Sequence, residues 1–555
     1  MSPFKKINDN DNLPLVKSLT RELPCHLDPV TLFESCIDQK ENALTNRILL
    51  ESCEVNTRKN LKSIIVNKSA VRITCNKNNV VLKALTNNGI NALLLIEKHF
   101  QFQLKEQKDS DFKLEKIDSE SLNITYLNSN RKNSNIEESQ RLLNITNLDC
   151  LRQINQLFFN HSQDNEFKSF LCGLFSFDLI DNFEILPEVS VSLNQCPDYV
   201  FYLAEELLVI DNENQHLRIY MNVFAGDNQK NIYYDLSRKI ETRIQQIRAT
   251  EENFNIRYVE HCEITDIQDN KVSISQSDEE YIDCVKKLKQ EIIDGNIFQV
   301  VPSRTFSLKC INELSSYRHL RESNPSPYMF FMQAQDFTLF GASPESALKY
   351  TTSSNSVELY PIAGTRARGR QIDGSIDHDL DKRYEIELKL DQKELSEHMM
   401  LVDLARNDIA RISKHASIEI PRLLEIDRYS QVMHLVSCVK GQLQKHLDCF
   451  HAYQACMNMG TLTGAPKIKA AELIRQVEGS RRGSYGGAVG YINSYGDMDT
   501  CIVIRSAYCR DGVAHIQAGA GVVYDSDPAS EARETRQKAQ AVINAIQQSN
   551  KVQMK

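Results

Sequence analysis

A chain of 555 residues is too long for a single core of ordinary size, so we expect two domains or one large layered body. Hydrophobic residues make up 41% and charged residues 25%, as in soluble globular proteins, and the net charge of -9 argues against a nucleic-acid-binding surface. No apolar run suits a secretory signal or a membrane span, so we expect a cytoplasmic protein that acts on a small molecule. The 15 cysteines form no C-x-x-C pair, which argues against a disulfide framework and a zinc site.

Residues 1–225 predict an N-terminal region of strands with a few helices. Short apolar runs alternate with Asn- and Lys-rich turns up to about residue 105, which is typical of antiparallel strands. From about 105 to 147 the composition shifts to Asn, Ser, Lys and Glu. We predict a solvated loop or a poorly packed insertion there, of which a plain connector is the simplest interpretation. Apolar runs return between 164 and 225.

Residues 226–270 are charged, and their Leu and Ile recur every three to four positions, so we predict a helical connector. Beyond it, acidic residues open a periodic segment that ends near Gly295, which predicts a helix followed by a strand. Nearly every unusual motif lies in this last part of the chain. We therefore assign the chemistry to a domain over residues 271–547.

Two pairs of glutamates, each at a spacing of three, are candidates for a metal site. The pairs are Glu394 with Glu397, and Glu531 with Glu534. Both lie in segments that predict helices, and the second segment begins with an Asp-Pro pair that suits a helix start. Residues three apart share a helix face, so two such faces together would offer oxygen ligands to Mg²⁺. Each pair alone is more often a solvated helix face, and spacing does not show that the faces meet.

His434 lies in QVMHLVSCVKG, where strand alternation places it on the face of Val436 and Cys438. A histidine there is either functional or held by a hydrogen bond as a structural residue, and the pattern leaves both open. Arg505, in the strand-like CIVIRSA, is a candidate to bind a carboxylate through its two-pronged side chain, or else forms a structural ion pair.

Glycine-rich turns can bring backbone amides close to an anion. Four of them follow predicted strands, at 360–365, 460–467, 484–487 and 517–521. None has the spacing of a nucleotide-binding loop, so nucleotide binding is disfavoured. We expect these turns to bind a carboxylate or a phosphate.

Nine strings of the chain occur in an order that marks one enzyme family. They are NPSPYMFFM, FGASPES, LYPIAGTRARGR, KELSEHMMLVDLARND, YSQVMHLVS, MNMGTLTGAPK, RRGSYGGAVGY, DTCIVIRSA and QAGAGVVYDSDPASEARET. They resemble the chorismate-utilising enzymes over about 270–545, most closely the anthranilate synthase component I family, and LLES at 49–52 extends the match. The resemblance implies an α+β fold of large antiparallel sheets covered by helices, with chorismate and Mg²⁺ in a cleft between the sheets.

The same resemblance assigns roles to single residues. It implies that Glu397 and Glu534 hold Mg²⁺, with Glu394 and Glu531 supporting the site. The residues implied in catalysis are Glu345 and His434, which handle protons, together with Gln299 and Glu394. Those implied to contact chorismate are Gly364, Thr365, Lys467, Tyr485, Arg505, Gly519, Ala520 and Gly521.

Two positions separate the branches of this family. Isochorismate and salicylate synthases have a lysine, which activates water, where this chain has Gln299. Aminodeoxychorismate synthase typically reads PIKGT where this chain has Ala363 in PIAGT. The two positions favour ammonia as the nucleophile and anthranilate as the product. The alternatives are aminodeoxychorismate synthase component I and a non-catalytic tryptophan-sensing protein on the same fold.

The resemblance also implies feedback inhibition and a partner. LLES and NPSPYM resemble a tryptophan pocket, which would be formed by Glu51, Ser52, Asn324, Pro327, Tyr328 and Met329. No glutaminase-like G-x-C-x-G string surrounds any cysteine. A separate glutamine amidotransferase, anthranilate synthase component II, is therefore expected to supply ammonia, usually within a heterotetramer.

Overall fold

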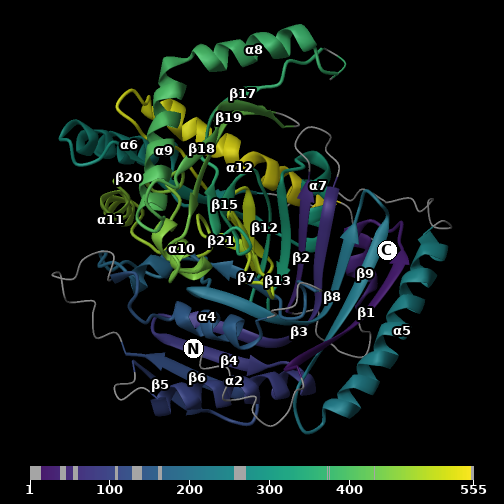
Figure 1. The fold of residues 1–555 in the computed structure, drawn as a ribbon. Helices are drawn as coiled ribbons and strands as arrows, with labels where there is room; N and C mark the ends of the chain where they lie inside the picture. Colours follow the sequence, from purple (N-terminus) through teal and green to yellow (C-terminus); the bar gives the residue numbers. More distant parts are fainter. Residues whose placement is uncertain are drawn as a thin grey trace.

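The computed structural model describes residues 14–37, 46–53, 60–106, 111–127, 141–159, 165–254, 271–371, 373, 375–429 and 432–551. Runs of strands are separated by helices along the chain (Figure 1). The elements before residue 255 are β1 (Val16–Pro24), α1 (Pro29–Ser35), β2 (Arg47–Cys53), β3 (Asn60–Asn76), β4 (Asn79–Ala84), α2 (Asn87–Glu106), β5 (Phe112–Lys116), β6 (Ser121–Tyr126), α4 (Leu148–Leu157), β7 (Leu171–Phe175), the 3₁₀ helix η2 (Phe177–Asn182), β8 (Tyr199–Asp211), β9 (His216–Phe224) and α5 (Gln229–Phe254).

The elements after residue 270 build the region to which the sequence assigned chemistry. They are β10 (Ser273–Ile274), α6 (Asp278–Ile293), β11 (Gln299–Val300), β12 (Ser303–Lys309), α7 (Glu313–Ser323), β13 (Tyr328–Gln333), β14 (Thr338–Ser343), β15 (Ser346–Thr351), β16 (Ser356–Leu359), β17 (Ile362–Ala367), α8 (His378–Leu390), α9 (Gln392–Ala410), β18 (Glu419–Arg428), β19 (Val432–Gln442), α10 (Cys449–Cys456), β20 (Gly464–Ala465), α11 (Lys467–Glu478), β21 (Ala488–Ile492), β22 (Met498–Ile502), β23 (Ser506–Arg510), β24 (Val513–Gly519) and α12 (Pro528–Lys551).

The long antiparallel strands β3 and β8 take part in two sheets. One half of this pair continues through β9 to β1 on one side, and through β2, β13, β14, β23, β24 and β12 on the other. The other half continues through β4 to β6, and through β7, β21, β22, β15, β16 and β19. Register shifts in β3 between Val66 and Val71 separate the halves, because bulges bend a strand. The predicted antiparallel α+β fold is confirmed.

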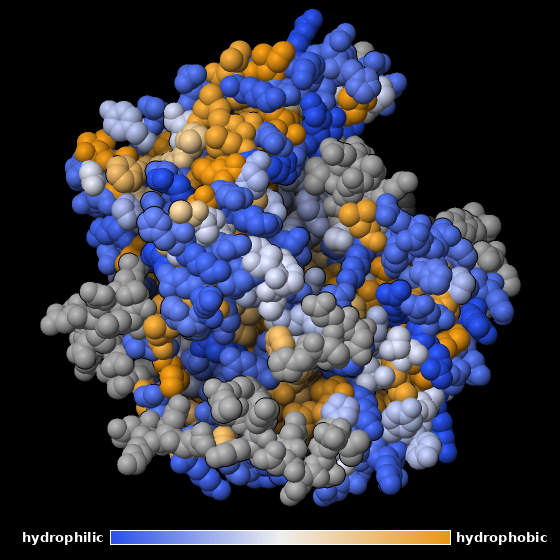
Figure 2. All heavy atoms as spheres, in the orientation of Figure 1, coloured by the Kyte–Doolittle hydropathy of each residue, from blue (hydrophilic) through white to orange (hydrophobic). Residues whose placement is uncertain are grey.

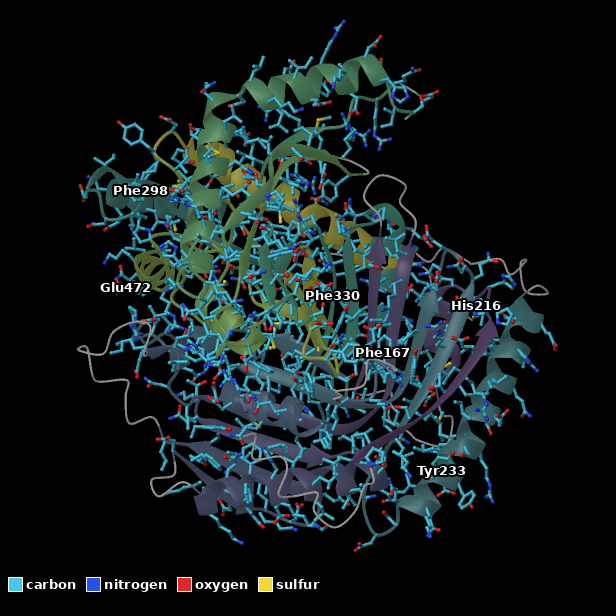
Figure 3. The ribbon with its side chains drawn as sticks, in the orientation of Figure 1. Phe167, His216, Tyr233, Phe298, Phe330 and Glu472 are labelled. Carbon is cyan, nitrogen blue, oxygen red and sulfur yellow. The ribbon has the colours of Figure 1, made fainter. Side chains whose placement is uncertain are left out.

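Both sheets contain strands from the predicted N-terminal region and from the predicted catalytic domain. Side chains of both sheets share one apolar core, which includes Phe330 of β13 and Phe167 (Figure 3). Helix α5 occupies most of the expected connector, whose residues 255–270 lie outside the described part. The two regions therefore build one body, and a division into domains at 225 and 270 stays a prediction.

Helices cover the outer faces of the sheets. Helix α2 packs on β3 and β4, α5 on β9, α9 on β17 and β19, and α12 on β24 (Figure 1). The apolar stripe of α12, with Val542, Ile543 and Ile546, is buried, as its three-to-four spacing requires. Helix α8 projects from the rest of the molecule, and apolar side chains gather at the surface around it (Figure 2).

The structure corrects one sequence interpretation. Residues 112–126, taken as part of a solvated insertion, form β5 and β6, which extend the sheet beyond β4. Phe112, Leu122 and Ile124 are buried, so the polar composition hid alternating apolar side chains. Residues 107–110 and 128–140 of the same stretch lie outside the described part. None of the described helices is long and apolar enough to cross a membrane.

Candidate active site

The two glutamate pairs lie within electrostatic reach of one another. Asp391 begins α9 by accepting hydrogen bonds from the first backbone amides, which places Glu394 and Glu397 in the first two turns. Burial is the largest of the causes that together raise the pKa of Glu397 to about 7, and the carboxylates of its own pair and of the α12 pair act in the same direction. The two pairs are therefore near one another, which their spacing could not establish, and the binding of a metal there stays a prediction.

Three of these carboxylates have a cation beside them. The pairs are Glu534–Lys538 at 2.7 Å, Glu394–Arg366 at 3.1 Å and Glu397–Lys393 at 3.8 Å. The Lys538 ammonium also donates to the Gly519 carbonyl at 3.0 Å. The sequence analysis missed Lys538, although its place one helical turn after Glu534 was a usable signal.

The chemistry of these side chains fits a hard divalent cation. All four are carboxylates, which Mg²⁺ prefers, and the mutual repulsion at Glu397 is what a cation would relieve. Within the described ranges no three acidic, His or Cys side chains are already gathered around one point. Ion binding would thus draw the carboxylates together and away from their lysine and arginine partners.

His434 lies opposite a bulge in β17. The register between β17 and β19 shifts between Ala363 and Thr365, and Gly364, at φ +70°, supplies the bulge. The His434 Nδ1 atom lies 3.0 Å from the Thr365 hydroxyl and 3.2 Å from the Gly364 carbonyl. Burial lowers the pKa of His434 to about 4, so the ring is neutral at pH 7.

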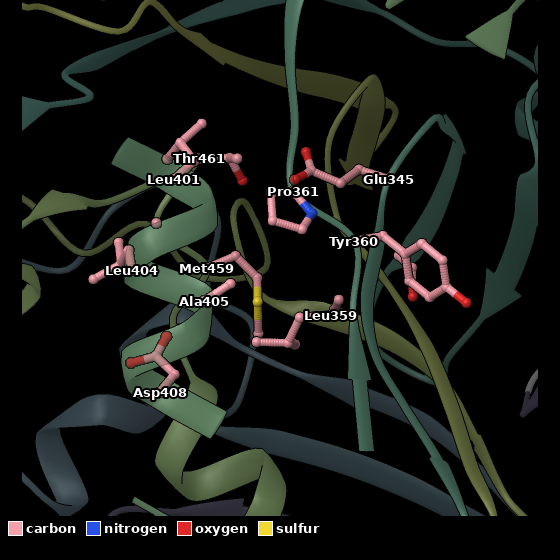
Figure 4. Close-up of a pocket in the computed structure, with 13 residues that line it drawn as sticks. Glu345, Leu359, Tyr360, Pro361, Leu401, Leu404, Ala405, Asp408, Met459 and Thr461 are labelled. Atoms are coloured by element: carbon pink, nitrogen blue, oxygen red, sulfur yellow. The ribbon is translucent and has the colours of Figure 1, made fainter. Parts of the chain in front are cut away.

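Glu345 is a buried acid directly before β15. Burial raises its pKa to about 8, which the nearby Thr461 hydroxyl and the charge of Lys538 only partly oppose. A cavity of about 30 Å³ adjoins it, and Figure 4 shows Glu345 and Thr461 at one end with Asp408 at the other. Glu345 is therefore largely protonated near pH 7 and able to donate a proton.

The turn at 519–521 joins several predicted substrate residues. A Cβ at Gly519 would lie 3.0 Å from the Tyr485 hydroxyl and 2.6 Å from the Pro302 carbonyl, so glycine is required there. A Cβ at Gly521 would lie 3.1 Å from Nε2 of Gln299. Ala520 between them is buried.

Two polar groups beside this turn face the site. The Oε1 atom of buried Gln299 has no hydrogen-bond partner among the described residues, which leaves it available to a ligand. Arg505 adopts φ +50° at the break between β22 and β23, donates to the Lys538 carbonyl at 2.9 Å, and lies within electrostatic reach of Glu534. Its side chain therefore belongs to the α12 carboxylate cluster.

Lys467 lies away from the carboxylates of α12 and is held by other partners. Its ammonium forms an ion pair with Asp408 and donates to the Cys456 carbonyl at 2.6 Å. The side chain thus fixes the start of α11 against α9. Its predicted contact with chorismate has no support in this arrangement.

The residues of the predicted tryptophan pocket lie on adjacent strands. Ser52 of β2 pairs with Tyr328 of β13, and Glu51 with Met329. The Tyr317 hydroxyl donates to Glu51 at 2.6 Å.

Other members of this group have local partners. Tyr328 donates its hydroxyl proton to Asp499 at 3.2 Å. Asn324 ends α7, and the half-buried Pro327 precedes β13. The strand pairing therefore joins two strings far apart in the chain, although nothing in the geometry tests tryptophan binding.

Comparison with known proteins identifies the family. The model of the chorismate binding enzymes matches residues 103–544. An anthranilate synthase component 1 of Vibrio parahaemolyticus is 49% identical over 536 residues, which cover 95% of this chain and 92% of that protein. The chain belongs to the anthranilate synthase component 1 family. The Escherichia coli member is 46% identical over 533 residues, 96% of this chain and 97% of that protein.

Solved structures agree with this family assignment. Anthranilate synthase component I of Streptococcus pneumoniae superposes with a TM-score of 0.62 at 25% identity, over 93% of this chain and 97% of that one. The menaquinone-specific isochorismate synthase of Escherichia coli gives 0.63 at 15% identity, over 96% and 95%, and so shares the fold. The predicted family and fold are both confirmed.

Proposed function

We propose that this chain is the chorismate-aminating component of anthranilate synthase, which opens the tryptophan branch of aromatic amino-acid synthesis. Ammonia adds to the chorismate ring as the ring hydroxyl leaves as water, and elimination of pyruvate then gives anthranilate. The observation that carries the proposal is that the two glutamate pairs lie within electrostatic reach of one another, in a chain 49% identical to a component 1.

Glu397 and Glu534 would hold Mg²⁺, with Glu394 and Glu531 in support. When bound, the ion neutralises the ring carboxylate of the substrate. The chain's own residues position that substrate: the turn at 519–521 offers backbone amides, and Tyr485, Thr365 and Arg505 offer hydrogen-bond donors around it.

Glu345 is the proposed general acid. Because its pKa is raised to about 8, it carries the proton that the departing hydroxyl needs at neutral pH. His434 assists the second stage, either by proton transfer or by orienting the leaving enolpyruvyl group. Its Nδ1 contact with the Gly364 carbonyl fixes the ring and leaves Nε2 as the nitrogen that can accept a proton.

Ammonia and not water is the proposed nucleophile. Gln299 is uncharged and cannot act as the base that would activate water, and Ala363 offers no amine in place of the lysine of PIKGT. Ammonia would come from a glutamine amidotransferase, component II, in a cytoplasmic heterotetramer. Tryptophan would bind beside the paired strands β2 and β13, at Ser52 and Tyr328, and inhibit the reaction.

The test is the fluorescence of product formed from chorismate, ammonium and Mg²⁺ by the purified chain, with EDTA and with tryptophan in parallel samples. Anthranilate that disappears with either addition supports enzyme, metal and inhibitor together. A non-fluorescent amino product would favour aminodeoxychorismate synthase. No turnover, with a melting temperature raised by tryptophan, would favour a sensor, because a ligand of the folded state stabilises it.

A further inference from the structure

Arg482 is a buried arginine in the RRGSYGGAVGY string, and the mechanism gives it no role. It lies between the end of α11 and Tyr485 in the chain, and 1% of its surface is exposed. A charged group buried without partners is costly, so a guanidinium at this depth is expected to have its donors occupied. The partners of Arg482 therefore indicate what the residue does.

The first partner of Arg482 is Glu478, the last residue of α11. Nε donates to one carboxylate oxygen at 3.0 Å and Nη2 to the other at 2.6 Å, so the ion pair is bidentate. The Glu478 carboxylate also accepts hydrogen bonds from the Ser303 amide at 2.8 Å and from the Ser303 hydroxyl at 2.7 Å. Glu478 thus joins Arg482 to the start of β12.

Ser303 lies against the turn at 519–521. It pairs with Gly519 between β12 and β24, and its hydroxyl accepts a hydrogen bond from the Gln517 side chain at 2.8 Å. A Cβ at Gly519 would lie 3.1 Å from the Cβ of Ser303. A shift of Ser303 would therefore move a turn that is proposed to bind chorismate.

The guanidinium also binds two backbone carbonyls beside the site. Nη2 donates to the Val301 carbonyl at 2.6 Å, and Nη1 donates to the Leu462 carbonyl at 2.8 Å. Val301 directly follows β11, the strand of Gln299. Leu462 directly follows Thr461, which lines the cavity beside Glu345. One side chain thus holds these two segments together.

The ring of Tyr485 lies beside the same guanidinium. The Cζ atom of Arg482 is 5.4 Å from the centroid of the Tyr485 ring and 4.6 Å from that of the Phe177 ring. A cation at this distance from an aromatic ring is attracted to its face. The Tyr485 hydroxyl in turn adjoins Gly519. The position of Tyr485 relative to the turn therefore depends on Arg482.

We propose that Arg482 is a positioning residue that fixes the chorismate-binding side of the site. Through its carboxylate partner it fixes the turn at 519–521. Directly it holds Tyr485 and the two segments whose carbonyls it binds. It acts through these groups and not on the substrate, since its guanidinium is buried and engaged by protein acceptors. The inference rests on the proposed function.

A pair of arginine variants separates positioning from packing. Arg482→Lys keeps the buried charge but loses the planar fork that binds Glu478 and the carbonyls together. Arg243→Lys is the matched control on α5, which lies away from α9 and α11 (Figure 1). Arg243 is also buried, forms a bidentate pair with Glu206 at 2.7 and 3.2 Å, and donates to the Cys36 carbonyl at 2.9 Å.

A pair of serine variants tests the same connection without disturbing a buried charge. Ser303→Ala removes the hydroxyl that joins Glu478 to Gln517. Ser169→Ala is its control, because this buried hydroxyl donates to the Phe158 carbonyl at 3.0 Å and belongs to neither proposed binding site. We would measure kcat, the KM for chorismate and the melting temperature of each full-length variant, with ammonium as nitrogen source and Mg²⁺ present.

Arg482→Lys should lower kcat/KM for chorismate by about 10²-fold, since a displacement of about 1 Å has an effect of that size. A large part of the loss should be a higher KM, because the displaced groups bind the substrate. A variant that is only less folded would lose kcat and keep its KM. Arg243→Lys should lower the melting temperature to a similar extent and keep the kinetic constants of the wild type.

Ser303→Ala should raise the KM for chorismate roughly 5-fold, the worth of one hydrogen bond, while Ser169→Ala leaves it unchanged. A KM for chorismate that is the same in Arg482→Lys as in Arg243→Lys would overturn the inference. If Arg482→Lys does not fold, an unchanged KM in Ser303→Ala overturns it instead. Wild-type protein that forms no anthranilate would overturn the proposed function, whereas these outcomes with an active wild type overturn this inference alone.

Discussion

Glu51 is buried and Glu397 is half-buried, and their surroundings are opposite. Glu51 accepts the Tyr317 hydroxyl proton at 2.6 Å and faces Arg321 at 3.0 Å. Glu397 has Lys393 at 3.8 Å and three further carboxylates within electrostatic reach. Burial raises the pKa of both, but Arg321 and Tyr317 oppose the rise at Glu51, whereas neighbouring acids add to it at Glu397.

The difference separates two kinds of carboxylate. A carboxylate that already has its hydrogen-bond and ion-pair partners, such as Glu51 beside the predicted tryptophan pocket, has a structural role. Carboxylates that crowd one another are held at a cost in stability and are suited to bind a cation. The contrast between the two regions can be tested by substitution.

The largest effect is expected at Glu397. Glu397→Gln should lower Mg²⁺-dependent anthranilate formation by about 10²–10³-fold, because it removes a charge that serves the site. The same change should raise the melting temperature of the metal-free protein, since it relieves repulsion among the acids. Glu279→Gln, on the exposed start of α6, is the control. A fall in the metal-free melting temperature would contradict the comparison.

Arg321→Met should lower the stability of the protein, whereas Glu397→Gln should raise it in the absence of metal. It leaves buried Glu51 without its ion pair, so the free energy of unfolding should fall by about 3 kcal/mol in denaturant titrations. Arg318→Met removes a more exposed pair with Glu34, and about 1 kcal/mol or less is expected. If the two arginine variants lose the same free energy of unfolding, the ion pair of Glu51 has no special structural role.

The raised pKa of Glu345 predicts a fall on the alkaline side of the pH–rate profile. The catalysed rate should fall as pH rises through about 8, where the proposed acid loses its proton. Thr461→Val removes a nearby hydroxyl that lowers this pKa, so the alkaline fall in rate should move to higher pH at a fixed concentration of un-ionised ammonia. Because the folded pKa lies above the ordinary 4.5, the stability this group contributes is present below pH 4.5 and is lost toward pH 8. If the rate of the Thr461 variant falls at the same pH as that of the wild type, Glu345 is not the group that causes the fall.

A smaller change in chemistry is expected at Gln299. The Gln299→Lys variant should admit water as a nucleophile, because an amine beside Gly521 can act as a base. Chromatography of the products should then show an isochorismate-type compound that the wild type lacks. Its absence from a folded variant would count against the role given to this side chain.

The smallest effect on turnover is expected at Ser52. Ser52→Phe should leave ammonia-dependent activity within about two-fold while it abolishes inhibition by tryptophan, since the added ring would fill the space beside Tyr328. The measurement is the rate of anthranilate formation by the wild type and by the Ser52→Phe variant at increasing tryptophan concentrations. Unchanged inhibition would show that the tryptophan pocket does not lie at β2 and β13.

Local patterns predicted several elements correctly. The acidic residues open α6, where Ser277 and Glu280 form a capping box, and the helix ends before Gly295, at φ +78°. His434 lies on a strand, as its alternation indicated. The error at 112–126 arose because polar composition outweighed the two-residue alternation of Leu122 and Ile124.

The sequence by itself determined which side chains share a helix face or a strand face, because those relations depend on the repeat of one element. It also supplied the ordered motifs by which the family was recognised. Only the tertiary structure decided that the acids of α9 come within electrostatic reach of those of α12, that Lys467 is held by Asp408, and that Gln299 lies beside Gly521. These contacts join segments far apart in the chain, and the packing of helices on two sheets that share β3 and β8 sets them.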